Sequence, residues 1–206
     1  MREINRAVMK KDALALVTGK PVYTEDIAPS DCLVVKALRS PHAHAIVRSV
    51  DKSMALKVPG IECILTAEDV PQTRFAIAGQ TYPELSPYDH CILDPHIRYV
   101  GDPVALIAGA DEASVCRAMK LVKVEYEVLE PLLDFRKAKD HTILVHPEED
   151  WKALVDTGGD PKRNLVSAAQ EDWGDLKAAM ESSEVVVEGV YHTKQAQQAM
   201  METFRA

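Results

Sequence analysis

The sequence predicts an α+β domain in which a mixed β-sheet is flanked by helices, and three segments carry this prediction. Residues 103–108 form an apolar run on both faces, which is typical of a central strand. Residues 111–122 place apolar side chains at three- and four-residue steps, which indicates an amphipathic helix. Residues 123–130 alternate apolar with charged side chains, which indicates a strand whose sheet has one side in water.

The elements before this central strand follow from shorter patterns. Residues 1–17 are expected to be a loosely ordered lead-in. Residues 32–38 are apolar and β-branched enough for a buried strand, and residues 45–50 alternate in a way that suits a second strand. Ser40 and Pro41 mark a bend between the two, because proline cannot donate a hydrogen bond to a β-ladder.

A short helix is expected over residues 51–58, where the Pro-Gly pair that follows would end it. Residues 61–65 are a further strand candidate. After them, Thr66 and Asp69 have the spacing of a helix cap, with the acid where a helix N-terminus favours negative charge.

Two long segments lack periodicity. Residues 72–97 contain three prolines and read as an irregular loop, and loops of this length inside a domain are usually functional or interface segments. Residues 141–163 have the glycine, proline and charge content of a linker or a surface-crossing loop. A short helix near Trp173 and a valine-rich strand over residues 183–191 complete the expected elements.

Length and composition limit the classes of protein. The chain has 206 residues, of which 47% are hydrophobic, so it can bury a core. The formal charge of -8 argues against a nucleic-acid backbone as the main partner, and no basic block contradicts this. We therefore expect no nucleic-acid partner.

The cysteines and the chain start indicate a reducing compartment. Four cysteines lie without any Cys-x-x-Cys spacing, and we expect reduced, mostly buried thiols at Cys32, Cys63, Cys91 and Cys116. The first residues are charged and include no apolar run that could act as a signal peptide. No apolar stretch is long enough to cross a bilayer, so a soluble cytoplasmic protein without a membrane partner is expected.

Common catalytic and phosphate-binding motifs do not fit. A phosphate-binding loop needs several glycines before a helix, whereas Gly101 and the pair Gly158-Gly159 do not open a convincing strand-to-helix turn. A nucleophile elbow of the Gly-x-Ser-x-Gly type is also absent from the sequence. Neither nucleotide binding nor serine-hydrolase chemistry is therefore indicated.

The histidines are the obvious metal-ligand candidates, and two of them alternate with alanine so that both would face one side of a strand. Their spacings match no common zinc signature, and no Glu or Cys lies at a helical step from them. We expect a structural or surface role for all seven and no metal ligand, with His42 and His44 hydrogen-bonded near a strand end. The seven are His42, His44, His90, His96, His141, His146 and His192.

Carboxylates that are neighbours in the sequence are expected to be solvated charges or helix caps, because catalytic pairs are made in space. These groups are Glu25-Asp26, Glu68-Asp69 and Glu148-Glu149-Asp150. Asp102 stands apart, since it lies between Gly101 and Pro103. It is expected to fix a turn that starts the central strand.

Several motifs occur in one fixed order. Residues 17–26 read VTGKPVYTED, residues 39–45 read RSPHAHA and residues 65–71 read LTAEDVP. Residues 99–105 then read YVGDPVA, and 184–189 read EVVVEG. In this order they resemble the start of the large subunit of molybdenum hydroxylases, the family of xanthine dehydrogenase and aldehyde oxidase, and the resemblance covers nearly the whole chain.

The resemblance implies an α/β hammerhead domain over residues 18–135, after the lead-in 1–17. Residues 136–169 would be a linker, and residues 170–206 would begin the much larger molybdopterin-binding domain. By resemblance, residues 195–202, with Gln195, Gln197, Gln198 and Glu202, are the opening strand and turn of that domain. The family's catalytic glutamate and cofactor loops lie farther along, so Glu202 is not that glutamate. No catalytic, cofactor-binding or metal-binding residue is assigned here.

The implied function is that of a structural, non-catalytic N-terminal part of a molybdenum hydroxylase, with the xanthine or purine dehydrogenase type favoured. The parent would hydroxylate an N-heterocycle with oxygen from water, using molybdopterin, FAD and 2Fe-2S clusters held elsewhere. Alternatives are the same domain of an aldehyde oxidase, carbon monoxide dehydrogenase, hydroxybenzoyl-CoA reductase or isoquinoline oxidoreductase relative. A free-standing interaction module is the alternative of a different class.

Partners follow from the same implication. They are the remaining molybdopterin-binding domain and the FAD and iron-sulfur subunits or domains, with residues 72–97 and 141–163 as the expected contact segments. The strand 183–191 could also pair with a second copy of the chain, because an exposed strand edge invites pairing. A homodimer is therefore a further expected partner state.

Overall fold

The computed structural model describes residues 7–20, 29–77, 82–194 and 196. Residues Leu33–Ser182 form one compact unit, and Met1–Cys32 with Ser183–Ala206 form the other. The expected sites Glu25-Asp26, Gln195, Gln197, Gln198 and Glu202 lie outside the described residues. In the described part, no helix is long and apolar enough to cross a membrane.

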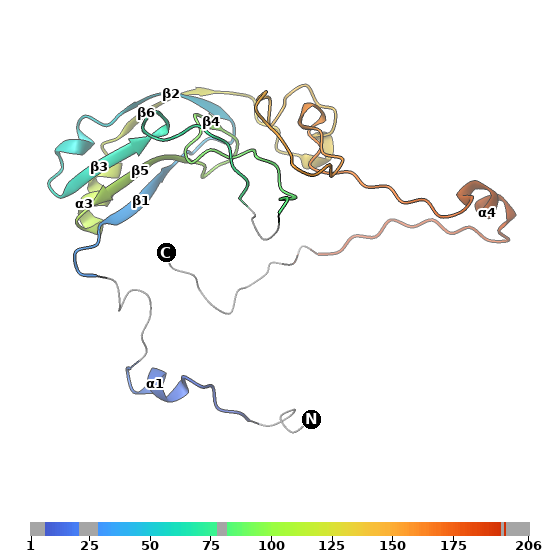
Figure 1. Ribbon diagram of the computed structural model, residues 1–206, viewed down its shortest axis with the longest axis horizontal. Coiled ribbons are helices and arrows are strands. Elements are labelled where there is room, and N and C mark those ends of the chain that lie inside the picture. Colours follow the sequence, from blue (N-terminus) through green and yellow to red (C-terminus); the bar gives the residue numbers. More distant parts are fainter. Residues whose placement is uncertain (1–6, 21–28, 78–81, 195, 197–206) are drawn as a thin grey trace. The chain divides into compact units, whose positions relative to one another are not determined.

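The larger unit contains two antiparallel three-stranded sheets (Figure 1). The first has the order β1-β5-β3, with β1 at Val34–Arg39, β5 at Pro103–Gly109 and β3 at Ile61–Thr66. The second has the order β4-β2-β6, with β4 at His96–Ile97, β2 at Ala45–Asp51 and β6 at Lys123–Val128.

The α+β class is confirmed, but the sheets are antiparallel rather than mixed. Helix α3, at Glu112–Met119, connects β5 to β6. Those two strands lie in different sheets, so the helix does not form the crossover between parallel neighbours that a mixed sheet requires.

Strand β5 is the centre of the first sheet, as its two-sided apolar sequence predicts. Val34 of β1 pairs with Gly109, and Leu65 of β3 pairs with Leu106. Helix α3 packs against β1 and β5, and Val115 of the helix is fully buried in the resulting core. A second core forms around Ala45, Ile97 and Val104, so β5 contributes to both.

Two predicted caps are confirmed. The Asp111 carboxylate accepts a hydrogen bond of 2.8 Å from the Ser114 amide at the start of α3. Thr66 and Asp69 form a reciprocal capping box at the short 3-10 helix Ala67–Asp69. In both places a side-chain oxygen satisfies a backbone N–H that the helix itself leaves without a partner.

Two other expected elements differ. The helix expected over 51–58 is reduced to the 3-10 turn Ala55–Lys57, because Val58 is extended before Pro59, as residues before proline usually are. The valine-rich segment 184–191 forms no strand with any described residue, and the exposure of its valines and Tyr191 runs from 49% to 88%. A strand needs a neighbour to accept its backbone hydrogen bonds, and valine content alone does not supply one.

The remaining helices are short. Helix α1, Ala13–Val17, lies in the predicted lead-in and buries no residue. Helix α4, Leu176–Ser182, is the short helix expected near Trp173. Two further 3-10 turns, Phe135–Lys137 and Pro161–Arg163, belong to the long segment that follows β6.

Candidate functional site

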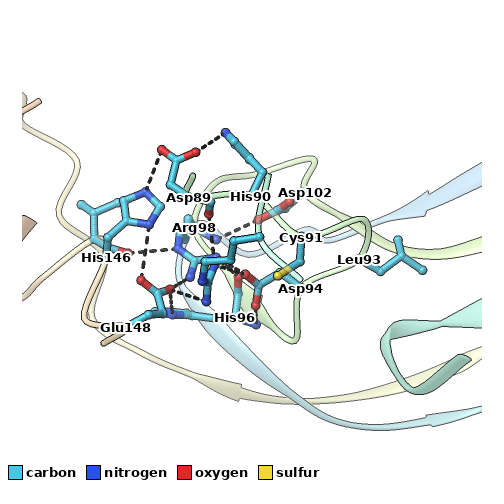
Figure 2. Close-up of polar contacts among 12 residues, drawn as sticks. Asp89, His90, Cys91, Leu93, Asp94, His96, Arg98, Asp102, His146 and Glu148 are labelled. Carbon is cyan, nitrogen blue, oxygen red and sulfur yellow. Dashed lines mark hydrogen bonds and ion pairs between the residues drawn. The ribbon is translucent and has the colours of Figure 1, made fainter. Parts of the chain in front are cut away.

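Four charged side chains, from two long loops and the turn after β4, meet in a buried cluster, which Figure 2 shows in part. The side chains of Arg74, Asp94, Arg98 and Glu148 are only 10–14% exposed. Both arginines bind Asp94, with N–O distances of 3.3 Å from Arg74 and 2.8 Å from Arg98. Both also form ion pairs with Glu148.

Main-chain carbonyls complete the coordination of the two guanidinium groups. Arg98 donates from Nε to the Val145 carbonyl at 3.0 Å and from Nη1 to the His96 carbonyl at 2.9 Å. Arg74 donates to the Asp89 carbonyl at 3.1 Å. The cluster thereby fastens the segment around Val145 and Glu148 to the loop that precedes β4.

The turns around β4 hold Asp94 and Arg98 in place. The Asp94 carboxylate accepts from the His96 amide at 2.9 Å, and Pro95 accepts from the Val47 amide of β2 at 2.8 Å. Burial raises the pKa of Asp94, but the His96 amide and Arg98 outweigh it and hold that pKa below its usual value. Asp94 is therefore charged at neutral pH, as the two arginines require.

Asp102 fixes the turn into β5, as predicted. Its carboxylate accepts from the Arg98 amide at 3.0 Å, and its own amide donates to the Tyr99 carbonyl at 3.2 Å. Gly101 has a φ of 99°, a conformation that residues with a side chain rarely adopt. Burial raises the pKa of the Asp102 carboxyl.

His44 and His96 face each other with their Nε2 atoms 2.9 Å apart. The other ring nitrogen of His44, Nδ1, lies 2.7 Å from the Glu130 carbonyl, which can only accept, so His44 carries its proton on Nδ1. The two Nε2 atoms form one hydrogen bond, in which one ring donates and the other accepts. The expected hydrogen bonding of His44 near a strand end is confirmed.

The ring positions are those of a hydrogen bond rather than of shared metal ligation. The ring centres of His44 and His96 lie 5.1 Å apart, and their Nε2 atoms lie 2.9 Å apart. The difference between these distances is about the sum of the two ring radii. The nitrogens therefore point at one another almost in line, whereas two imidazoles on one metal ion converge on it at an angle.

His90 and His146 flank the same cluster on the side of Asp89 (Figure 2). His146 lies with Nε2 3.9 Å from Asp89 and with Nδ1 3.4 Å from Glu148, and His90 Nε2 lies 3.2 Å from Asp89. Burial, followed by the charges of Arg98 and Arg74, lowers the pKa of His146 to about 4. Burial and Arg98 also lower the pKa of His96, so both rings are neutral at pH 7.

The remaining histidines lie apart from the cluster. His42 packs edge-on against Tyr126, with ring centres 4.8 Å apart, and His141 accepts from the Ile143 amide at 3.0 Å. His192 is exposed. Across the residues that the structure describes, no three His, Cys, Asp or Glu side chains are placed to share a metal ion.

Glu148 corrects one expectation. It was expected to be a solvated charge, together with Glu149 and Asp150, but its side chain is buried between Arg74 and Arg98. Glu149 and Asp150 are exposed, and the Asp150 carboxylate forms an ion pair of 2.7 Å with Arg74. Asp69 belongs to a helix cap, as expected, and Glu68 lies in the first turn of the same 3-10 helix. Nothing local distinguishes Glu148 from Glu149, because the partners of Glu148 come from a distant loop.

The two buried arginines and the Gly158-Gly159 pair do not fit the molybdenum-pterin group that the resemblance implies for the parent. Its phosphate would need free cationic or amide donors, yet both buried guanidinium groups are already bound by carboxylates and carbonyls. The pair Gly158-Gly159 does not form an open cradle, because Cβ atoms there would meet the chain's own backbone at 2.2 and 2.7 Å. No reaction step is therefore assigned to these residues.

Comparison with known proteins gives a consistent set of relatives. Residues 18–130 match the family model described as aldehyde oxidase and xanthine dehydrogenase, a/b hammerhead domain. The chain is 32% identical to a probable hypoxanthine oxidase of Escherichia coli strain K12, over 97% of this chain and 23% of that protein. It is 31% identical to a xanthine dehydrogenase molybdenum-binding subunit of Escherichia coli O157:H7, over 95% of this chain and 25% of that subunit.

A solved structure agrees with these matches. The aldehyde oxidoreductase from Desulfovibrio gigas aligns with a TM-score of 0.57 and 30% identity, over 66% of this chain and 16% of that one. The chain thus spans about a quarter or less of the length of the proteins it resembles.

Proposed function

Because the chain belongs to the aldehyde oxidase and xanthine dehydrogenase family, we propose that it is the structural, non-catalytic N-terminal part of a xanthine or purine dehydrogenase-type molybdenum hydroxylase. The hammerhead fold expected from the sequence is confirmed by the family match and by the solved structure. The observation that carries the proposal is the family match over residues 18–130. The relatives named for hypoxanthine and xanthine favour the purine type within that family.

In this proposal the parent protein hydroxylates an N-heterocycle with oxygen derived from water. Molybdopterin supplies the oxidative chemistry when bound, and FAD and 2Fe-2S clusters carry electrons on partner domains or subunits. The proposed division is a hammerhead over 18–135, a linker over 136–169 and the start of the molybdopterin-binding domain over 170–206. The role proposed for this chain's residues is structural, because their buried charges form ion pairs with one another.

The ion-pair cluster gives the proposed contact segments a defined form. Residues 72–97 carry Arg74 and Asp94, and residues 141–163 carry Glu148, so the ion pairs among them join the two loops. A fixed surface is a better docking platform than two independent loops, because less conformational freedom is lost on binding. We propose that this joined surface seats the rest of the parent enzyme.

Elemental analysis tests the non-catalytic assignment. The 206-residue chain is expressed in a host that makes the molybdenum cofactor, purified, and analysed for molybdenum and for xanthine-dependent reduction of an electron acceptor. Both are expected at background. Stoichiometric molybdenum in the purified chain would contradict the proposal.

Hydrogen exchange tests the proposed docking. Exchange of the chain is compared with exchange of the same residues within the whole parent enzyme. Added protection is expected in residues 72–77, 82–97 and 141–163, with little change in β5, which is already buried. Unchanged exchange in both loops would refute the docking role without affecting the molybdenum result.

A further inference from the structure

A cavity of about 420 Å³ lies beside the ion-pair cluster, within the larger unit. Its walls are mainly apolar and include the rings of Phe135 and Trp151 together with Leu165 and Val166. Its volume is within the range of about 300–1,000 Å³ that small-molecule sites occupy. The polar side chains on its lining are those of Asp89, His146 and Asn164.

Asn164 builds the wall and has no bonding capacity left for a ligand on its amide nitrogen. Its Nδ2 donates to the Ala138 carbonyl at 2.9 Å and to the Ile143 carbonyl at 2.8 Å. Its Oδ1 accepts from the Val145 amide at 3.0 Å. These three bonds tie residues on two sides of the cavity together, so the cavity is a formed feature of the fold.

Asp89 supplies a negative charge on the lining without a cationic partner. Its carboxylate lies 3.2 Å from His90 and 3.9 Å from His146, and no Arg or Lys of the described residues is within ion-pair distance of it. Arg74 donates a hydrogen bond to the main-chain carbonyl of Asp89, not to its carboxylate. The ion pairs of Arg74 are with Asp94, Glu148 and Asp150.

His146, one of the two histidines beside Asp89, does not neutralise this charge. Burial and the two arginines hold the pKa of His146 at about 4, so its ring is neutral at pH 7. The Asp89 side chain is only 19% exposed, and a carboxylate that has lost most of its water is stabilised by a cation placed against it. Aromatic walls add to that preference, because the faces of Trp and Phe rings attract cations.

We propose that this cavity binds a small organic cation with a flat apolar body, its charge paired with Asp89 and its body packed between Phe135 and Trp151. The proposal does not rest on the molybdenum chemistry proposed above. Because Asp89, His146 and Trp151 lie in the proposed contact segments 72–97 and 141–163, it concerns the 206-residue chain without the rest of the parent enzyme. It differs from the ion-pair cluster because Asp89 lines a cavity and forms no ion pair with any described arginine.

Benzamidine is a suitable probe for the intact 206-residue chain, since it is a flat ring with an amidinium group that fits a carboxylate. Titration of the ¹⁵N-labelled chain, followed by NMR, is expected to give a Kd on the order of 1 mM for a ligand of this size. Shifted amides should lie around residues 89, 135, 151 and 164–166. Benzamide, which is nearly isosteric and neutral, should bind at least about fivefold more weakly.

Two variants and a control separate charge from shape. Asp89→Asn should reduce benzamidine affinity to that of benzamide. Asp140→Asn, which removes a surface carboxylate paired with Arg163, should leave it unchanged. Phe135→Ser should weaken both probes, and it is a safe second variant because Phe135 is 84% exposed and its loss does not empty the core.

Three outcomes would overturn the proposal. These are no saturable shifts with benzamidine at concentrations up to about ten times the expected Kd, equal affinity for benzamidine and benzamide, and unchanged benzamidine affinity in a folded Asp89→Asn chain. Should the Asp89→Asn chain not fold, the ratio of the two affinities in the unaltered chain and the effect of Phe135→Ser decide the question.

Discussion

Replacing Glu148 by glutamine removes one buried negative charge while keeping the size of the side chain. Glu148 is 14% exposed and forms ion pairs with Arg74 and Arg98. Removing one partner of a buried ion pair destabilises proteins by about 3–5 kcal/mol, because the remaining charge stays buried. Asp94 still binds both arginines, so we expect the lower end of this range, about 3 kcal/mol.

The loss should concentrate where Glu148 is anchored. Urea unfolding followed by circular dichroism measures the free energy of unfolding, and hydrogen exchange locates the change. Amides near Val145 and Glu148 should exchange faster, whereas those of β5 should lose protection only as far as global stability falls. The matched control is Glu149→Gln, which makes the same change one residue away at an exposed position.

A change in the free energy of unfolding below about 0.5 kcal/mol for Glu148→Gln, equal to that of Glu149→Gln, would refute the reasoning. It would mean that the cluster contributes no more than exposed ion pairs, whose usual contribution is about 0–1 kcal/mol. The function proposed for the two loops as one fixed surface would then lose its physical basis.

Three further predictions concern pH, capping and self-association. Because the folded pKa of His146 is about 4 against 6.5 when unfolded, only the unfolded ring binds a proton between these values, and the free energy of unfolding should fall as pH decreases through that window. His146→Gln should flatten this dependence in urea titrations, whereas exposed His192→Gln should not. Asp111→Ala removes the cap of α3 and should lower stability by about 1 kcal/mol in the same assay. If segment 183–191 pairs with a second copy, sedimentation should show a dimer that Val186→Lys abolishes; a dimer that survives this change would exclude that segment.

Local sequence patterns predicted the elements whose partners are close in sequence or whose burial is complete. The apolar steps of α3 appear in the structure, and the alternation of β6 holds through Glu127, whereas Val128 is exposed. The caps at Asp111 and Thr66 are equally local, since each joins residues three positions apart. Such features depend on short-range geometry that the sequence displays directly.

The ion-pair cluster could not be predicted in this way. Arg74 and Glu148 lie in two irregular loops, and Arg98 lies in the turn after β4. Their meeting depends on how these segments pack rather than on any spacing. The pairing of His44 with His96 has the same origin, because β4 brings His96 beside β2. The valine-rich composition of 184–191 predicted a strand that this described segment does not form. Among the described residues, no neighbouring strand accepts its backbone hydrogen bonds.

The position of β5 also has a consequence for the order of folding. Gly109 at its end pairs with Val34 and with Ile61, so the first sheet has no centre until the chain has been synthesised through residue 109. Until then β1 and β3 lack the strand with which both of them pair. Closing loops of this length is slow compared with forming a helix. We therefore expect the first sheet to close once β5 has been synthesised, and the second sheet to close after β6 has followed it.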